Sequence, residues 1–142
     1  MLPLTHTSHF DDVLKAFYYE FADVYVFKGF VISEIKEGTI FSYDNHAKKI
    51  IDDVTSYNNT NGSDLIYISH RIHSYSVQPM DWLKFFKNQF SLKGYGVIGY
   101  SDQGFVNTVI ESLFFNKKIK RFKDLDSAIK WAENKELADL EA

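Results

Sequence analysis

The residue types best suited to chemistry gather in residues 69–78. His70 and His73 lie three positions apart, and imidazole acts both as a metal ligand and as a general base near neutral pH. A zinc site needs a further ligand, which Asp64 or Asp81 would supply only if the fold brought one of them close. Serines flank both histidines, yet no carboxylate stands at a spacing that would orient either imidazole. We therefore expect no metal and no catalytic residue here, predict that both histidines are partly exposed on a loop, and interpret the segment as a binding surface.

A glycine-rich run forms a second candidate motif. Gly94-Tyr95-Gly96-Val97-Ile98-Gly99 matches the pattern G-x-G-x-x-G, which binds dinucleotides when it follows a strand and opens a helix. Here the run follows an expected helix, and Val97 and Ile98 belong to the strand itself. We therefore predict that these glycines end a helix and permit close helix–sheet packing, and that the protein uses no cofactor.

A cluster of five basic residues lies around Ile119 and Phe122. The whole chain carries 16 Lys and Arg against 19 Asp and Glu, for a net charge of −3. A nucleic-acid binder usually has a basic excess, so we expect no nucleic-acid partner. The cluster is interpreted as a solvated strand edge, where lysines oppose edge-to-edge pairing. Its members are Lys117, Lys118, Lys120, Arg121 and Lys123.

Length and composition favour one globular domain spanning residues 1–142. Apolar residues make up 45% of the chain and charged residues 25%, which is typical of a folded domain. There is no cysteine, which excludes disulfides, thiol nucleophiles and cysteine-ligated metals. The first ten residues lack the pattern of a secretory signal, and no apolar run is long enough for an integral membrane segment. We expect a cytoplasmic location.

Hydrophobic periodicity predicts an α/β fold with a mixed, mainly parallel sheet. A hairpin opens the sheet around Gly29, Gly38 closes its second strand, and the later strands alternate with helices, an order that requires parallel pairing through right-handed crossovers. The helix at 43–56 is capped by Ser42 or Asp44, and the last helix begins at Asp124 or Asp126. The expected strands cover residues 16–21, 24–27, 30–35, 65–69, 95–100 and 119–122; the expected helices cover 43–56, a segment from Pro79, 105–113 and a segment from 124.

Four pieces of the chain carry a resemblance to a known family. They are the hairpin at 25–31, the strand at 65–69, the strand at 96–100 with its helix, and the closing run 120–131, in which a short strand ends in Phe122 before an acidic-capped helix with Trp131. Together they resemble the SpoIIAA-like branch of the STAS superfamily, the fold of anti-sigma-factor antagonists. The resemblance spans residues 24–134 and leaves 1–15 and 135–142 as peripheral segments.

The resemblance implies a regulatory protein-interaction domain that is not an enzyme. In anti-sigma-factor antagonists a phosphorylated Ser or Thr begins the helix after the central strand. The matching segment here, residues 73–79, has no Asp-Ser-Ser-Gly run, and its candidate phosphoacceptors are Ser74 and Ser76. The residues expected to contact a partner or ligand, together with the helix from Pro79, are Ser69, His70, Arg71, His73, Ser74, Tyr75 and Ser76.

Three further readings remain open. The same superfamily fold occurs in SEC14-type lipid-binding domains, so a small hydrophobic ligand is an alternative to a protein partner. Phenylalanines would line its pocket. A homodimer is also compatible with the sequence, and the weakest reading, an enzyme, would rest on the crowding of Ser69, His70, His73 and Ser74. The phenylalanines are Phe85, Phe86, Phe90, Phe105, Phe114 and Phe115.

Overall fold

The computed structural model describes residues 1–73, 75–77, 80–81, 92–100 and 119–141, with only the backbone for 136–141. An α/β architecture is present, as the periodicity predicts. Two 3₁₀ turns and one π-helical turn accompany the regular elements. The elements are η1 (Leu4–His6), η2 (Ser8–Asp12), β1 (Lys15–Tyr18), β2 (Ala22–Phe27), β3 (Phe30–Ile35), β4 (Ile40–Phe41), η3 (Tyr43–Ala47), α1 (Lys48–Asn58), β5 (Ile66–Arg71), β6 (Ser76–Val77), β7 (Gly94–Gly99), β8 (Ile119–Phe122) and α4 (Leu125–Glu141).

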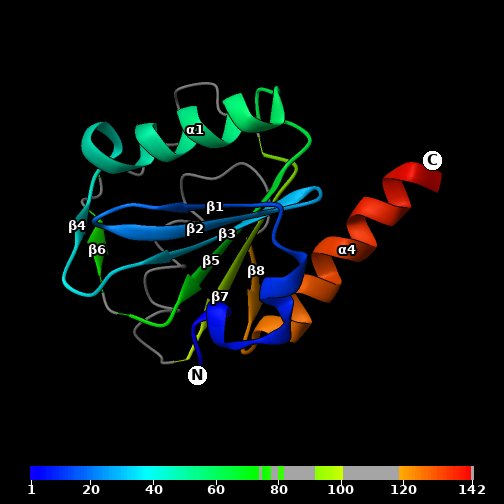
Figure 1. Ribbon diagram of the computed structural model, residues 1–142, viewed down its shortest axis with the longest axis horizontal. Helices are drawn as coiled ribbons and strands as arrows, with labels where there is room; N and C mark the ends of the chain where they lie inside the picture. Colours follow the sequence, from blue (N-terminus) through cyan, green and yellow to red (C-terminus); the bar gives the residue numbers. More distant parts are fainter. Residues whose placement is uncertain (74, 78–79, 82–91, 101–118, 142) are drawn as a thin grey trace.

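Six strands form one mixed sheet in the order β1-β2-β3-β5-β7-β8 (Figure 1). The pairs β1–β2 and β2–β3 are antiparallel, whereas β3–β5, β5–β7 and β7–β8 are parallel. The predicted mixed sheet with parallel later strands is therefore confirmed. At the turn of the opening hairpin, Gly29 has a φ of 82°, a conformation that favours glycine over residues with a side chain.

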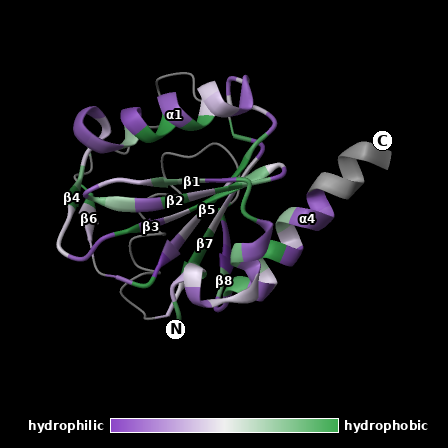
Figure 2. Ribbon diagram, viewed as in Figure 1, coloured by the Kyte–Doolittle hydropathy of each residue, from purple (hydrophilic) through white to green (hydrophobic). Residues whose placement is uncertain are grey.

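The sheet is covered on both faces, which gives three layers (Figure 1). Helix α1 and the last residue of η3 pack on one face through Ala47, Ile50, Ile51 and Val54, the stripe that the helical periodicity predicts. Helix α4 and the N-terminal residue Leu4 pack on the other face. All six residues of β3 and all six of β7 are buried, because two-sided covering leaves no solvent face on the inner strands. Hydropathy colouring shows green, apolar segments along the inner strands (Figure 2).

Side-chain caps begin both helical segments where the sequence indicates. The backbone N–H of Asn45 donates to Oγ of Ser42 at 3.2 Å, at the start of the helical segment that leads into α1. The N–H of Ser127 donates to Oδ1 of Asp124 at 2.7 Å, one residue before α4 begins. Each cap satisfies a backbone donor that has no partner within its own helix.

The glycines of β7 make room for an indole ring. A Cβ placed on Gly96 would lie 3.1 Å from Cζ3 of Trp131 and 3.3 Å from Cε2 of Phe122. A Cβ on Gly94 would lie 3.4 Å from Cη2 of Trp131. Close packing of α4 against the sheet is thus a reason for glycine at position 96, in agreement with the packing role predicted for this run, whereas the distance at position 94 is an ordinary contact.

The segment after the central strand differs from the expected loop. Strand β5 continues through His70 and Arg71, beyond the predicted end at residue 69. Residues 76–77 then form β6, which pairs in parallel with β4 through Ile40–Ser76 and Phe41–Val77. These two-residue strands are too short to be recognised from periodicity. The helix expected from Pro79 is described only at residues 80–81, and the helix expected at 105–113 lies outside the described residues.

Candidate functional site

Three polar side chains meet where three neighbouring parallel strands end. Glu34 lies near the end of β3, His70 near the end of β5, and Tyr100 directly follows β7. Side chains alternate between the two faces of a strand, so Glu34 shares the α4 face with Ile32, and His70 shares it with Ile68. The polar group therefore lies at the end of an apolar face, at the sheet edge where open α/β sheets commonly bind ligands.

The three side chains form a continuous hydrogen-bond chain. Nδ1 of His70 lies 2.8 Å from Oε2 of Glu34, and Nε2 of His70 lies 2.7 Å from the hydroxyl of Tyr100. Oε2 of Glu34 also accepts from the backbone N–H of Leu4 at 2.9 Å. A neutral His70 that carries its proton on Nδ1 satisfies all these groups, because Nδ1–H then donates to the carboxylate and the phenol donates to Nε2.

The hydrogen-bond chain formed by Glu34, His70 and Tyr100 is largely buried, and burial affects the pKa of the phenol. Glu34 is 4% exposed and His70 is 1% exposed. Burial, reinforced by the nearby carboxylates of Asp124 and Glu34, raises the pKa of the Tyr100 phenol above its ordinary value. The phenol thus stays protonated near neutral pH, and it donates to Nε2 when His70 carries its proton on Nδ1.

The arrangement has the connectivity of a catalytic triad but lacks an activated nucleophile. A carboxylate orients an imidazole, and the imidazole accepts from a hydroxyl, as in hydrolytic triads. The hydroxyl is a phenol whose pKa is raised, whereas an activated nucleophile needs an environment that favours deprotonation. Among the residues that the structure describes, neither nitrogen of His70 bonds a serine. This geometry supports a structural role, in which buried hydrogen bonds hold together the ends of three strands and the N-terminal segment.

Two of the predicted site residues are buried in strand β5, and Ser69 lies within the expected strand whereas His70 lies beyond its expected end. Ser69 and His70 are each 1% exposed within β5, so the expectation of a partly exposed loop histidine is wrong for His70. The backbone continues its parallel pairing with β7 through Arg71, opposite Gly99, which keeps the segment in the sheet. His70 cannot contact a partner while the fold is intact.

Arg71, Ser69 and Tyr75 come together on the α1 face of the sheet. Nε of Arg71 donates to Oγ of Ser69 at 3.1 Å, and the Tyr75 hydroxyl lies 3.2 Å from the same Oγ. The guanidinium carbon of Arg71 lies 5.8 Å from the centroid of the Tyr75 ring, a cation–π geometry. Three predicted residues are thus adjacent, but they face away from the chain formed by His70.

Two further predicted residues, His73 and Ser76, lie on the rim of the sheet. His73 is exposed, and its Nδ1 lies 3.7 Å from Oε2 of the exposed Glu37. Ser76 is exposed in β6, and its backbone N–H donates to the carbonyl of Thr39 at 3.1 Å. The sequence predicts Ser76 just before the start of a helix, whereas the structure has it in strand β6. Ser74 lies outside the described residues.

The two aspartates considered as metal ligands have other partners. Oδ1 of Asp64 accepts from the Thr60 hydroxyl at 2.6 Å, and Oδ1 of Asp81 accepts from the Tyr43 backbone N–H at 3.0 Å. Among the residues that the structure describes, no group of three or more His, Asp or Glu side chains is arranged to hold a metal ion.

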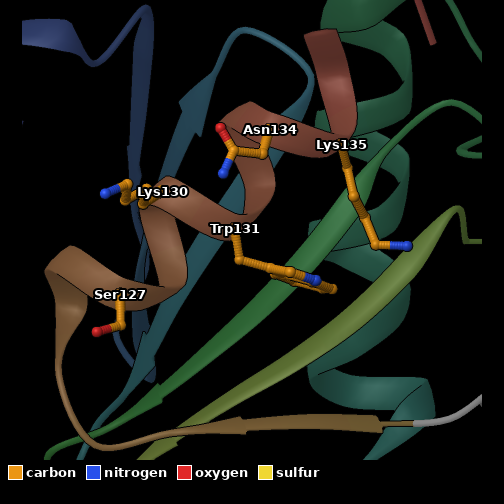
Figure 3. A pocket seen from close by; sticks show the side chains of 5 residues that line it. All are labelled: Ser127, Lys130, Trp131, Asn134 and Lys135. Carbon is orange, nitrogen blue, oxygen red and sulfur yellow. The ribbon is translucent and has the colours of Figure 1, made fainter. Parts of the chain in front are cut away.

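A surface hollow of about 520 Å³ lies beside the indole of Trp131 on α4. Figure 3 shows Trp131 and Lys135 extending from the helix on the same side, and Nζ of Lys135 lies 5.6 Å from the centroid of the indole. Polar residues supply the rest of the lining, although most of the exposed lining surface is apolar. Its other lining residues are Ser127, Lys130 and Asn134. All six phenylalanines proposed to line a ligand pocket lie outside the described residues.

Glu34 is the site residue that sequence reasoning missed. A signal for it exists, because Glu34 shares one face of its strand with the apolar residues Phe30 and Ile32. A carboxylate at such a position is rarely buried without a partner. The partner is 36 positions away, and only the parallel register of β3 and β5 brings His70 beside it.

Comparison of the chain with protein-family models, with curated proteins and with solved structures finds no match. Within the described part of the chain, none of the helices has the length and apolar character required to cross a lipid bilayer.

Proposed function

We propose that this protein is a non-enzymatic regulatory domain of the STAS or SpoIIAA-like type, which acts by binding another protein. Its contact surface, here termed the contact edge, comprises five residues that follow β3 and β5. They are Glu37, Ile40, His73, Ser76 and Met80.

Two exposed apolar side chains carry the proposal. Ile40 is 63% exposed and Met80 is 69% exposed. Ile40 pairs with Ser76 across β4 and β6, and the hydrogen bond from Tyr43 to Asp81 ties the residue after Met80 to the same end of the sheet. Apolar side chains surrounded by polar ones are typical of protein interfaces. Glu37, His73 and Ser76 supply the polar surroundings.

The properties of the buried hydrogen-bond chain support a binding role over catalysis. A protonated Tyr100 phenol and a fully buried His70 are poorly suited to attack a substrate. A small hydrophobic ligand of the SEC14 type is the alternative function, and residues outside the described ones would have to line its pocket. A protein partner is favoured because two of the exposed apolar side chains, Ile40 and Met80, belong to the contact edge.

Regulation by phosphorylation would act at the same edge. Ser76 is exposed beside Ile40, so a phosphate there would place about 1.5 to 2 negative charges next to the apolar contact. A serine-to-glutamate change at Ser76 should weaken partner binding about tenfold, which corresponds to about 1.4 kcal/mol. Ser74 is the second candidate acceptor.

Paired charge substitutions test the contact edge. Affinity purification from the source cells is compared for the wild-type chain, for Ile40→Asp combined with Met80→Asp, and for Leu14→Asp as control, because Leu14 is 58% exposed on another part of the surface. A partner retained by the control and lost by the double variant is then purified, and its affinity is measured by calorimetry. A loss of at least tenfold is expected. Retention of every partner by the double variant would refute the contact edge.

A further inference from the structure

Leu4 lies in a buried position on the α4 face of the sheet, here termed the seat. Its side chain is fully buried within the core cluster that includes Tyr25, Ile32 and Ile98. Its backbone N–H donates to the buried carboxylate of Glu34 at 2.9 Å. The seat therefore combines an apolar hole the size of a leucine side chain with one hydrogen-bond acceptor, and His70 holds that acceptor in place from the other side.

The rest of the N-terminal segment, residues 1–12, is weakly attached. Its own hydrogen bonds are local, from His6 to Pro3 and from Thr7 to Leu4. In the described part of the chain, the first backbone hydrogen bond to the sheet is made by Leu14, to Val26. Phe10 touches Tyr25 edge-on with 6.0 Å between the ring centroids. Leu4 is thus the principal anchor of the segment.

One ion pair adds little to this attachment. Nε2 of His9 lies 2.5 Å from Oδ1 of Asp126 at the start of α4, and Figure 1 shows the N-terminal segment beside that helix. The Asp126 side chain is 86% exposed, and exposed ion pairs contribute little to stability. A segment held by one buried side chain and few other contacts can open without unfolding the sheet.

We propose that residues 1–12 are a displaceable plug, and that the seat beneath Leu4 is a binding site for a partner peptide. The peptide would present a leucine-sized apolar side chain and the backbone N–H of that same residue, because the seat now holds both groups. The carboxylate of Glu34 favours a donor at this point. The seat lies on the opposite face of the sheet from the Arg71–Tyr75 pair, and it does not depend on the contact edge.

A peptide added in trans tests the seat in the full-length protein. The probe is a fluorescein-labelled synthetic peptide of residues 1–12, and binding is followed by anisotropy. Leu4→Asp in the protein should release the plug and allow the probe to bind, whereas the wild-type protein and the control Leu2→Asp should bind it at least tenfold more weakly. Leu2 suits as control because it is 55% exposed. Leu4→Ala in the probe should weaken binding to the released protein at least tenfold.

Two results would overturn the proposal. One is a folded Leu4→Asp protein, verified by circular dichroism, that fails to bind the probe or binds it no better than the Leu2→Asp protein does. Hydrogen exchange on the wild-type chain supplies the other and applies even if the variant fails to fold. The Leu4 amide should exchange through an opened state that is at least tenfold more populated than the state that exposes the β5 amides. Equal protection of the Leu4 and β5 amides would show that residues 1–12 do not open separately from the sheet. Ile40→Asp with Met80→Asp should leave probe binding to Leu4→Asp unchanged, so failure of the contact edge and failure of the seat are distinguishable.

Discussion

Oε2 of Glu34 lies 2.8 Å from Nδ1 of His70, and the two side chains meet across neighbouring parallel strands on an otherwise apolar face. The same carboxylate oxygen accepts from Leu4, so one buried acceptor joins β3, β5 and the N-terminal segment. A buried polar pair of this kind is strongly destabilising to break, because the remaining partner stays desolvated.

Replacing Glu34 by Gln should therefore destabilise the protein. Both donors bond the same oxygen, Oε2, so the amide oxygen of Gln can keep both partners but lacks the negative charge that strengthens these bonds. An NH₂ group also takes the place of the other carboxylate oxygen at this buried site, and the weakened hydrogen bonds should cost about 1 to 3 kcal/mol. Urea unfolding followed by circular dichroism measures the change. Glu37→Gln is the matched control, because the Glu37 side chain is 72% exposed and surface changes typically cost less than about 0.5 kcal/mol. Equal stability of the two variants would contradict the role given to Glu34.

Adding one methyl group at Gly96 should disturb the packing of α4. The new Cβ would lie 3.1 Å from the Trp131 ring and 3.3 Å from the Phe122 ring, and overpacking of this kind typically costs about 1 to 3 kcal/mol. Gly94→Ala is the control, since its Cβ would lie at an ordinary contact distance of 3.4 Å. Thermal unfolding should place Gly96→Ala below Gly94→Ala in melting temperature. The reverse order would show that the indole can shift freely.

The cap at Asp124 predicts a stability contribution that depends on pH. The hydrogen bonds from Ser127 lower the pKa of the Asp124 carboxyl below its ordinary value of 3.8. Stability from this charge is therefore full well above pH 3.8, and it is lost as the pH falls through the lower, folded-state value. Asp124→Ala should cost about 1 kcal/mol near neutral pH, which is typical of a lost N-cap.

Asp124→Asn separates the charge from the cap. Asparagine caps helices about as well as aspartate, so this variant should match the wild-type chain near neutral pH more closely than Asp124→Ala does. It should also lose less stability between pH 5 and pH 2 than the wild type, because the side chain at 124 no longer titrates. Urea unfolding at a series of pH values measures both effects. An unchanged acid dependence in Asp124→Asn would count against the assignment.

His46 should titrate at a lower pH than a free histidine. Burial lowers its pKa from 6.5, and the ring lies 4.5 Å from Phe21 and 5.4 Å from Phe41 between centroids. Its Nδ1 accepts from the Ser42 backbone N–H at 2.9 Å, which needs the neutral ring. Because the folded-state pKa is depressed, this contribution is full above pH 6.5 and declines as the pH falls toward that pKa. NMR titration, with His46→Gln to assign the signal, should give a midpoint below 6.5; a midpoint above it would refute the prediction.

Local sequence patterns determine most of the described elements. The β-rich runs around Gly29, the apolar stripe from Ala47 to Val54, and Asp124 as the helix cap are readable from spacing alone and are present as predicted. These features depend on residues within a few positions of one another, and local backbone and side-chain preferences are strong there. Strands β4 and β6 cannot be predicted in this way, because a strand of two residues is too short to show an alternating pattern.

The polar chain at the sheet edge was decided by tertiary structure. The sequence places His70 among serines and a second histidine and suggests an exposed loop, whereas the strand register buries it between Glu34 and Tyr100, which lie 36 and 30 positions away. Leu4, in a segment that the sequence suggests is peripheral, is fully buried against the same group. Long-range pairing of parallel strands produces these contacts, and the register of a strand with a distant partner depends on the packing of the whole sheet and not on the residues of either strand alone.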